Sequence, residues 1–198
     1  MKLFYVIGLV ALAGGCSTVG GLSEPKDIPS LVKSYRIAGL EERTGDVATM
    51  LDLDECAEYA ILSSVGLSGV PSVAGHFPVR QLVAREFQKV IAGNFRTVMP
   101  EEEPKLELRI VSDRLAVKRS WSRVTSEMAF EIQLVDPEHI RRPYFRKDYR
   151  LSAESIQRRK GEVPICVYSC IQNLAREFLE DVSKDTHVIA RLRALGEE

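Results

Sequence analysis

Four cysteines carry the most versatile chemistry in this chain, because a thiol can be covalently modified, oxidised to a disulfide or bound to a metal. They are Cys16, Cys56, Cys166 and Cys170. Cys16 differs from the others in its setting, since it follows two glycines at the end of the uncharged apolar run 3–13. It is therefore a candidate for modification beside a cleavage site, whereas the other three belong to the folded part of the chain.

Residues 1–15 have the three-part plan of a secretory signal. Lys2 supplies a positive charge, residues 3–13 are apolar, and Gly14 and Gly15 are small residues of the kind that a signal peptidase accepts. The apolar run is shorter than the about 20 residues that a permanent transmembrane helix needs. We therefore predict that residues 1–15 are a signal peptide and are removed.

The segment Leu12-Ala13-Gly14-Gly15-Cys16 resembles the lipobox of bacterial lipoproteins, a small-small-Cys cleavage site usually preceded by leucine. Ala13 departs from that pattern, since the leucine lies one residue further back. The resemblance implies lipidation of Cys16 and anchoring to a membrane through that lipid; a plain signal peptide with an unmodified cysteine is the alternative. Ser17 in place of aspartate favours, by the same resemblance, the outer membrane facing the periplasm, with the inner membrane also open.

The rest of the precursor divides into a linker and one domain. Residues 16–32 are rich in glycine, proline and polar residues without periodicity, which predicts a flexible linker. Residues 33–198 are long enough for a single domain with its own core. The formal net charge of −1 gives no global electrostatic reason to expect binding to nucleic acid.

The first part of the domain has three predicted elements. Residues 33–41 are expected to form a strand. Asp52 and Glu55 have the spacing of a capping box, which predicts a helix ending near Ser64 with Cys56 on its core face. Glycine, serine and proline are frequent from Val65 to Pro78, which predicts a loop.

Stronger patterns follow. Apolar residues at intervals of three and four predict an amphipathic helix over 78–95. Three segments then alternate apolar and polar residues, and the alternation changes phase near Ser112-Asp113, which predicts a β-bulge. A last long helix is expected from Pro164 to Val182, with helix resuming over 188–195. The three alternating segments are 106–117, 128–134 and 145–151.

Together these elements predict an α+β fold. It would be a two-layer sandwich, with helices packed on one face of a mostly antiparallel sheet of about four strands. The three histidines (His76, His139 and His187) lack metal-ligand spacing, and no phosphate-binding or nucleophile motif occurs. We therefore expect no catalytic residues, no metal and no cofactor.

Two further groups are candidate sites. Cys56 and Cys170 would both face the core in the predicted helices, so a disulfide between them is one interpretation, and buried free thiols are the other. Arg146 and Arg150 would share the polar side of one strand, with Arg142 extending the row if the strand begins early. This row is either charge protection of an edge strand or a patch for an anionic partner.

The element order over residues 33–182, together with the lipobox, resembles the auxiliary lipoproteins of ABC-type lipid-transport systems and, more distantly, lipopolysaccharide-assembly lipoproteins and penicillin-binding-protein activators. The predicted helix at 53–64 departs from their pattern. The resemblance implies a non-enzymatic periplasmic lipoprotein whose partners are the membrane and an envelope protein complex or a lipid carrier. The alternative is a lipid-anchored envelope enzyme without a recognisable motif.

Overall fold

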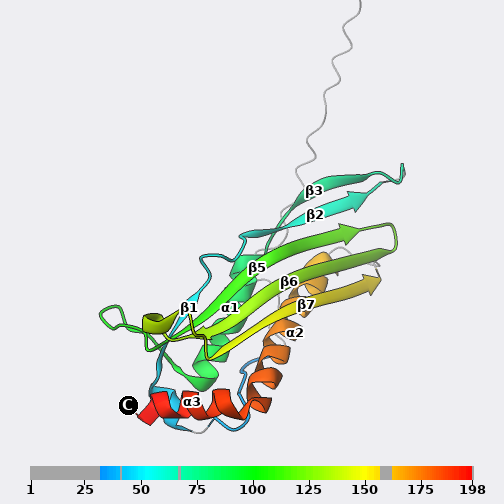
Figure 1. Cartoon of the computed structure of the whole chain (residues 1–198). Coiled ribbons are helices and arrows are strands. Elements are labelled where there is room, and N and C mark those ends of the chain that lie inside the picture. The colour runs from blue at the N-terminus through cyan, green and yellow to red at the C-terminus, as the bar shows by residue number, and fades with distance from the viewer. Residues whose placement is uncertain (1–31, 41, 67, 157–161, 198) are drawn as a thin grey trace, which may run out of the picture.

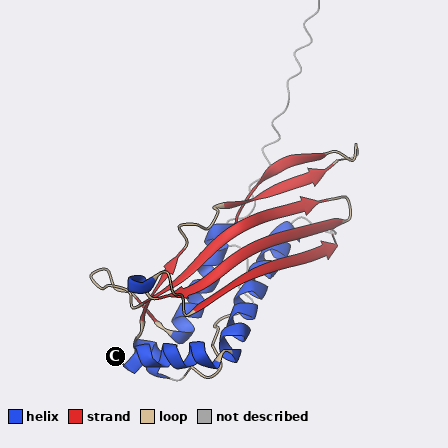
Figure 2. Ribbon diagram, in the orientation of Figure 1, coloured by secondary structure: helices blue, strands red, loops and turns tan. Residues whose placement is uncertain are grey.

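The computed structural model describes residues 32–40, 42–66, 68–156 and 162–197. The predicted signal peptide, Cys16 and the predicted linker up to residue 31 lie outside these residues. Figures 1 and 2 show one twisted sheet with α1 and α2 on one of its faces and α3 across one end. In chain order the elements are η2 (Glu42–Asp46), β1 (Ala48–Asp52), β2 (Tyr59–Val65), β3 (Pro71–Pro78), α1 (Val79–Asn94), β4 (Arg96–Thr97), β5 (Leu106–Arg119), β6 (Arg123–Val135), η3 (Pro137–His139), β7 (Phe145–Ile156), α2 (Glu162–Lys184) and α3 (Thr186–Glu197).

The sheet has seven strands in the described part of the chain, and it is mixed. Strands β5, β6 and β7 form an antiparallel meander, and β2 and β3 form an antiparallel hairpin. β1 and β2 both pair with β5 in parallel, and β4 pairs with β1 in parallel. The prediction of an α+β fold is therefore confirmed. The prediction of about four mostly antiparallel strands is wrong, because the segments before α1 join the meander through parallel pairing.

Strand β5 pairs with two strands, β1 and β2, along the same edge. Its first half pairs with β1 and its second half with β2, and the β-bulge between Ser112 and Arg114 separates the two halves. The chain between β1 and β2 bonds to this bulge: Ala57 N donates to Ser112 Oγ at 2.7 Å, and Ser112 N donates to Glu55 O at 3.3 Å. The bulge predicted from the change of phase is thus confirmed, and it lies where one partner strand ends and the next begins.

The predicted helix at 53–64 is wrong. Asp52 uses its carboxylate for other contacts: one oxygen accepts from Asp54 N at 2.9 Å, and the other pairs with Arg109 Nε at 2.7 Å. The chain therefore turns at this point and continues as β2, where Ala60 and Leu62 are buried. The predicted loop at 65–78 is also wrong, because most of it forms β3, which pairs with β2 as a hairpin.

Residues 33–40 are not the predicted strand but an irregular segment lying on α1. Its backbone bonds to the Asn94 side chain: Ile37 N donates to Oδ1 at 2.7 Å, and Nδ2 donates to Tyr35 O at 3.2 Å. A side-chain amide thus satisfies backbone groups that a neighbouring strand would otherwise have paired. Its place on the helix side of the molecule explains why residues 33–40 add no strand to the sheet.

The predicted helices at 78–95 and from Pro164 are confirmed as α1 and α2, and α3 matches the predicted resumption of helix. Phe87 of α1 and Phe178 of α2 lie with ring centroids 6.0 Å apart, and Phe145 of β7 lies 5.6 Å from Phe178. Phe87 and Phe178 are fully buried. These rings join both helices to the sheet in one core.

We predict that Phe87→Ala destabilises the fold by about 3–5 kcal/mol, since truncation removes a fully buried ring and leaves a cavity. Denaturant unfolding of the purified protein measures the loss. Gln88→Ala, at the next and exposed position of α1, is the control and should stay within about 0.5 kcal/mol of the parent. A loss below about 1 kcal/mol for Phe87→Ala would contradict its place in the core.

Candidate functional site

Two of the three arginines predicted to form a row, Arg146 and Arg150, do share one face of a strand. Arg146 and Arg150 both lie in β7 and point to the sheet face that carries no helix, whereas Arg142 lies in the loop before β7, because the strand begins only at Phe145. Arg146 Nη2 pairs with Glu131 Oε2 of β6 at 2.8 Å. Asp148 stands between the two arginines on the same face. The surface therefore alternates positive and negative charge.

This pairing fixes the charge states of the two partners. Hydrogen bonding to Glu131 and the charge of that carboxylate raise the pKa of Arg146. Burial acts to raise the pKa of Glu131, but hydrogen bonds from Arg146 and Gln133 outweigh it and hold this pKa below its usual range. Beside the pair, a shallow pocket of about 260 Å³ on the open face is lined by residues that include Val111, Asp148 and Arg150. The face can thus offer a partner a fixed pattern of charges.

The three cysteines of the domain are buried free thiols, as in the second of the two interpretations, and no bridge joins Cys56 to Cys170. Cys56 lies in the turn between β1 and β2, not on a helix, and Cys170 Sγ lies 2.9 Å from Ser126 Oγ of β6. The same hydroxyl lies 3.4 Å from Cys166 Sγ. Burial raises the pKa of both Cys56 and Cys170 to about 11, so these thiols are protonated and weakly nucleophilic at neutral pH.

A buried carboxylate that the sequence reasoning missed joins three segments of the fold. Glu86 of α1 is fully buried. Its carboxylate accepts from Tyr35 Oη at 2.8 Å and from Tyr168 Oη of α2 at 2.5 Å, and it pairs with Lys89 Nζ at 2.6 Å. Burial and the Glu86 carboxylate together raise the pKa of Tyr35. The sequence pattern does indicate its burial, because Glu86 falls on the apolar stripe of its helix, four residues after Leu82 and four before Val90.

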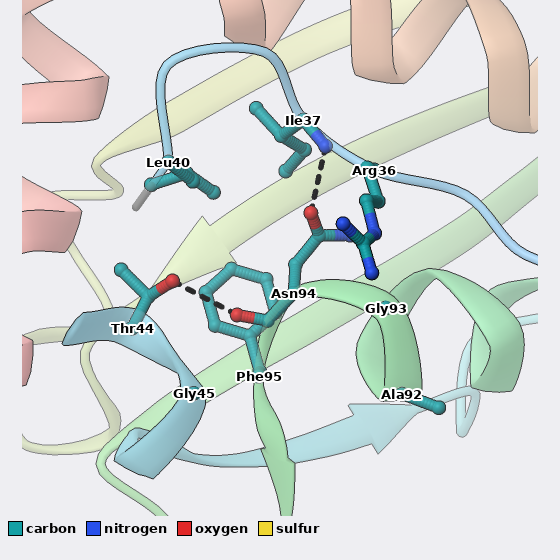
Figure 3. A pocket seen from close by; sticks show the side chains of 9 residues that line it. All are labelled: Arg36, Ile37, Leu40, Thr44, Gly45, Ala92, Gly93, Asn94 and Phe95. Atoms are coloured by element: carbon teal, nitrogen blue, oxygen red, sulfur yellow. Dashed lines mark hydrogen bonds between the residues drawn. The ribbon is translucent and has the colours of Figure 1, made fainter. Parts of the chain in front are cut away.

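A second pocket, of about 280 Å³, lies where the segment 33–40 crosses the end of α1 (Figure 3). Arg36, Leu40 and Phe95 contribute to its lining. Asn94 closes it from below: besides its bonds to the crossing segment, its backbone O accepts from Thr44 Oγ1 at 2.9 Å. The Asn94 amide is thus engaged in bonds within the protein, and Arg36 is the charged side chain among the lining residues.

No group of three or more histidine, cysteine or acidic side chains in the described residues is arranged to hold a metal ion. None of the helices in this part of the chain has the length and apolarity needed to cross a bilayer.

We predict that Gly93→Ala destabilises the protein by about 1–3 kcal/mol, because a Cβ at this position would lie 1.9 Å from Tyr35 O and would push the crossing segment off α1. Helix propensity alone predicts the opposite, a gain of about 1 kcal/mol. Gly45→Ala, whose Cβ would meet nothing within 4 Å, is the matched control. Denaturant unfolding compares the three proteins; a stabilised Gly93→Ala protein would refute the close approach.

Comparison with known proteins gives a fold and no family. No family model matches the chain, and no curated protein matches it significantly. Among solved structures, a Xanthomonas campestris protein of the DUF330 family matches with a TM-score of 0.54 at 11% identity, over 76% of this chain and 89% of that one. A candidate lipoprotein from Caulobacter crescentus matches with a TM-score of 0.36 at 11% identity, over 53% and 77%. The first likeness shows that this chain shares the fold of the Xanthomonas protein.

Proposed function

We propose that this chain is a lipid-anchored protein of the bacterial envelope that acts by binding and not by catalysis. In this proposal, Cys16 carries the lipid, and the folded body stands on the periplasmic side of the outer membrane. There it recognises an envelope protein complex or a lipid carrier, as an auxiliary component of a lipid-transport system. The observation that carries the proposal is the small-small-Cys site behind an uncharged apolar run.

The open face of the sheet supports the binding role. Both long helices pack on the opposite face (Figure 2). The outward side chains are exposed or half-buried from Arg123 to Gln133 in β6 and from Arg146 to Ile156 in β7. Ion pairs hold these side chains in place: Arg146 with Glu131 at 2.8 Å, and Arg123 with Glu154 at 3.0 Å. A rigid surface of alternating charges selects a partner by complementarity of charge.

The anchor is tested at its cysteine. We predict that Cys16→Ser abolishes incorporation of a fatty-acid analogue and leaves the signal peptide uncut by the lipoprotein pathway. Thr18→Ala, which changes a neighbouring residue and keeps the thiol, is the control and should label like the parent. Metabolic labelling followed by membrane fractionation measures both effects. Equal labelling of the Cys16→Ser and parent proteins would disprove the anchor.

The binding role is tested by position. A photo-crosslinking residue placed at Arg150, on the open face, should give a reproducible adduct with an envelope component in intact membranes. The same residue placed at Glu180, exposed on the helix side, is the control and should give little. Mass spectrometry of the adducts identifies the partner. Equal adducts from the two positions would mean that the open face is not the recognition surface.

A further inference from the structure

Five large apolar side chains lie exposed on elements that meet near one end of the sheet. The β2–β3 hairpin, the β5–β6 turn and the end of β7 lie at the right-hand end in Figure 1. The five side chains come from the hairpin of β2 and β3, the turn between β5 and β6, the end of β7 and the first turn of α2. Each is more than half exposed. We call this group the apolar tip; its members and their exposed fractions are Val70 65%, Val73 69%, Trp121 73%, Ile156 61% and Ile165 59%.

Strand register and helix contacts bring these residues together. Ser64, near the β2–β3 turn, pairs with Arg119, and Arg123 on the other side of the Trp121 turn pairs with Ile156. The first turns of α2 reach the same end, where Cys166 Sγ donates to Ala153 O of β7 at 3.1 Å. The apolar tip is thus one surface built from four neighbouring elements. A cluster of five exposed apolar side chains at one end of a domain is typical of an interaction site.

The charges around the apolar tip are mainly positive. Lys118, Arg119 and Arg123 flank the Trp121 turn. Lys118 pairs with Glu127 at 3.6 Å and Arg123 with Glu154 at 3.0 Å, while Arg119 has no ion-pair partner among the described residues. Strands β2 and β3 contain no acidic or basic residue except His76. An anionic surface facing this end would therefore meet the guanidinium of Arg119. The nearby carboxylates of Glu127 and Glu154 are already paired with Lys118 and Arg123.

These features fit a bilayer surface better than a folded protein. The apolar tip is formed by projecting turns and strand ends, whereas the two pockets described above lie elsewhere on the molecule. Tryptophan and aliphatic side chains next to basic residues are the combination that partitions into the headgroup region. The reach of the chain allows the contact, because residues 16–32 can span at most about 60 Å, more than the about 46 Å length of β5, which has 14 residues. The last of these, Val32, is held to α1 by Lys89 Nζ at 3.1 Å.

We propose that the apolar tip lies against the bilayer that carries the lipid anchor, with Trp121 at headgroup level and Arg119 beside anionic headgroups. The inference rests on the anchor in the proposed function and adds an orientation to it. The body would be docked on the membrane at two points, the lipid and the tip. The open face of the sheet would then have a fixed direction relative to the bilayer.

Trp121 is the only tryptophan of the chain, so its fluorescence reports on the apolar tip alone. The full lipidated chain is reconstituted in vesicles of phosphatidylcholine with or without phosphatidylglycerol, and flotation checks that it stays with the lipid. We expect Trp121 emission to move to shorter wavelength in the anionic vesicles. We also expect quenching by phospholipids brominated near the headgroup and weak quenching by aqueous acrylamide.

Variants test the two parts of the contact. Arg119→Glu should reduce the docked fraction in anionic vesicles, with the ratio of docked to free tips falling at least about fivefold, and should matter little in phosphatidylcholine alone. Ile165→Asp should reduce docking in both. Met99→Asp, which alters an exposed apolar residue in the loop before β5, is the matched control and should leave Trp121 quenching unchanged. Circular dichroism melting checks that each variant is folded. If Ile165→Asp does not fold, Arg119→Glu alone tests the docking.

The outcomes separate the inference from the proposed function. A chain that floats with the vesicles but whose Trp121 is open to acrylamide and unquenched by brominated lipid would keep its anchor and overturn the docked tip. Protection from acrylamide without quenching by brominated lipid would overturn it in favour of a contact between proteins. A chain that does not float would refute the anchor itself.

Discussion

The buried carboxylate of Glu86 is the constraint on which the helix layer depends. A polar group in the interior is tolerated only when hydrogen-bonding partners replace the water that it has lost. Tyr35, Tyr168 and Lys89 are those partners, and they come from the crossing segment, α2 and α1. Removal of one partner from such a buried group is strongly destabilising, so the bonds from Tyr35 and Tyr168 tie the crossing segment and α2 to α1.

This arrangement also determines where the chain that leads to Cys16 leaves the body. Lys89 bonds both to the Glu86 carboxylate and to Val32 O, and Gly93 lets Tyr35 approach the α1 backbone closely. The N-terminal segment is therefore held on the helix layer. Residues 32–40 therefore do not cover the open face of the sheet.

How much of the fold the sequence predicts depends on whether the pattern is local. The alternation in β6, the helical periodicity of α1 and the change of phase in β5 are local, and each prediction was right. The segment 52–64 was misread because Asp52 and Glu55 match a capping box, whereas in the fold Asp52 pairs with Arg109, a residue far ahead in the chain. Parallel pairing of β2 with β5 is equally non-local, and no short pattern records it. The irregular segment 33–40 has the alternation of a strand, but its backbone partner is one side chain of α1.

The candidate sites divide in the same way. The arginines of β7 were placed correctly on one face by their spacing, but their charge is partly compensated by Glu131, which belongs to a different strand and is brought alongside only by the register of β6 and β7. Trp121 lies in the turn between β5 and β6, and its position beside the β2–β3 hairpin and the end of β7 follows only from the strand register. Glu86 is the opposite case, since its place on the apolar stripe of α1 was readable from periodicity alone. A charged residue at a core position of a helix must find partners across the fold, so attention to this one position would have predicted that other segments pack onto the helix with donors directed inward.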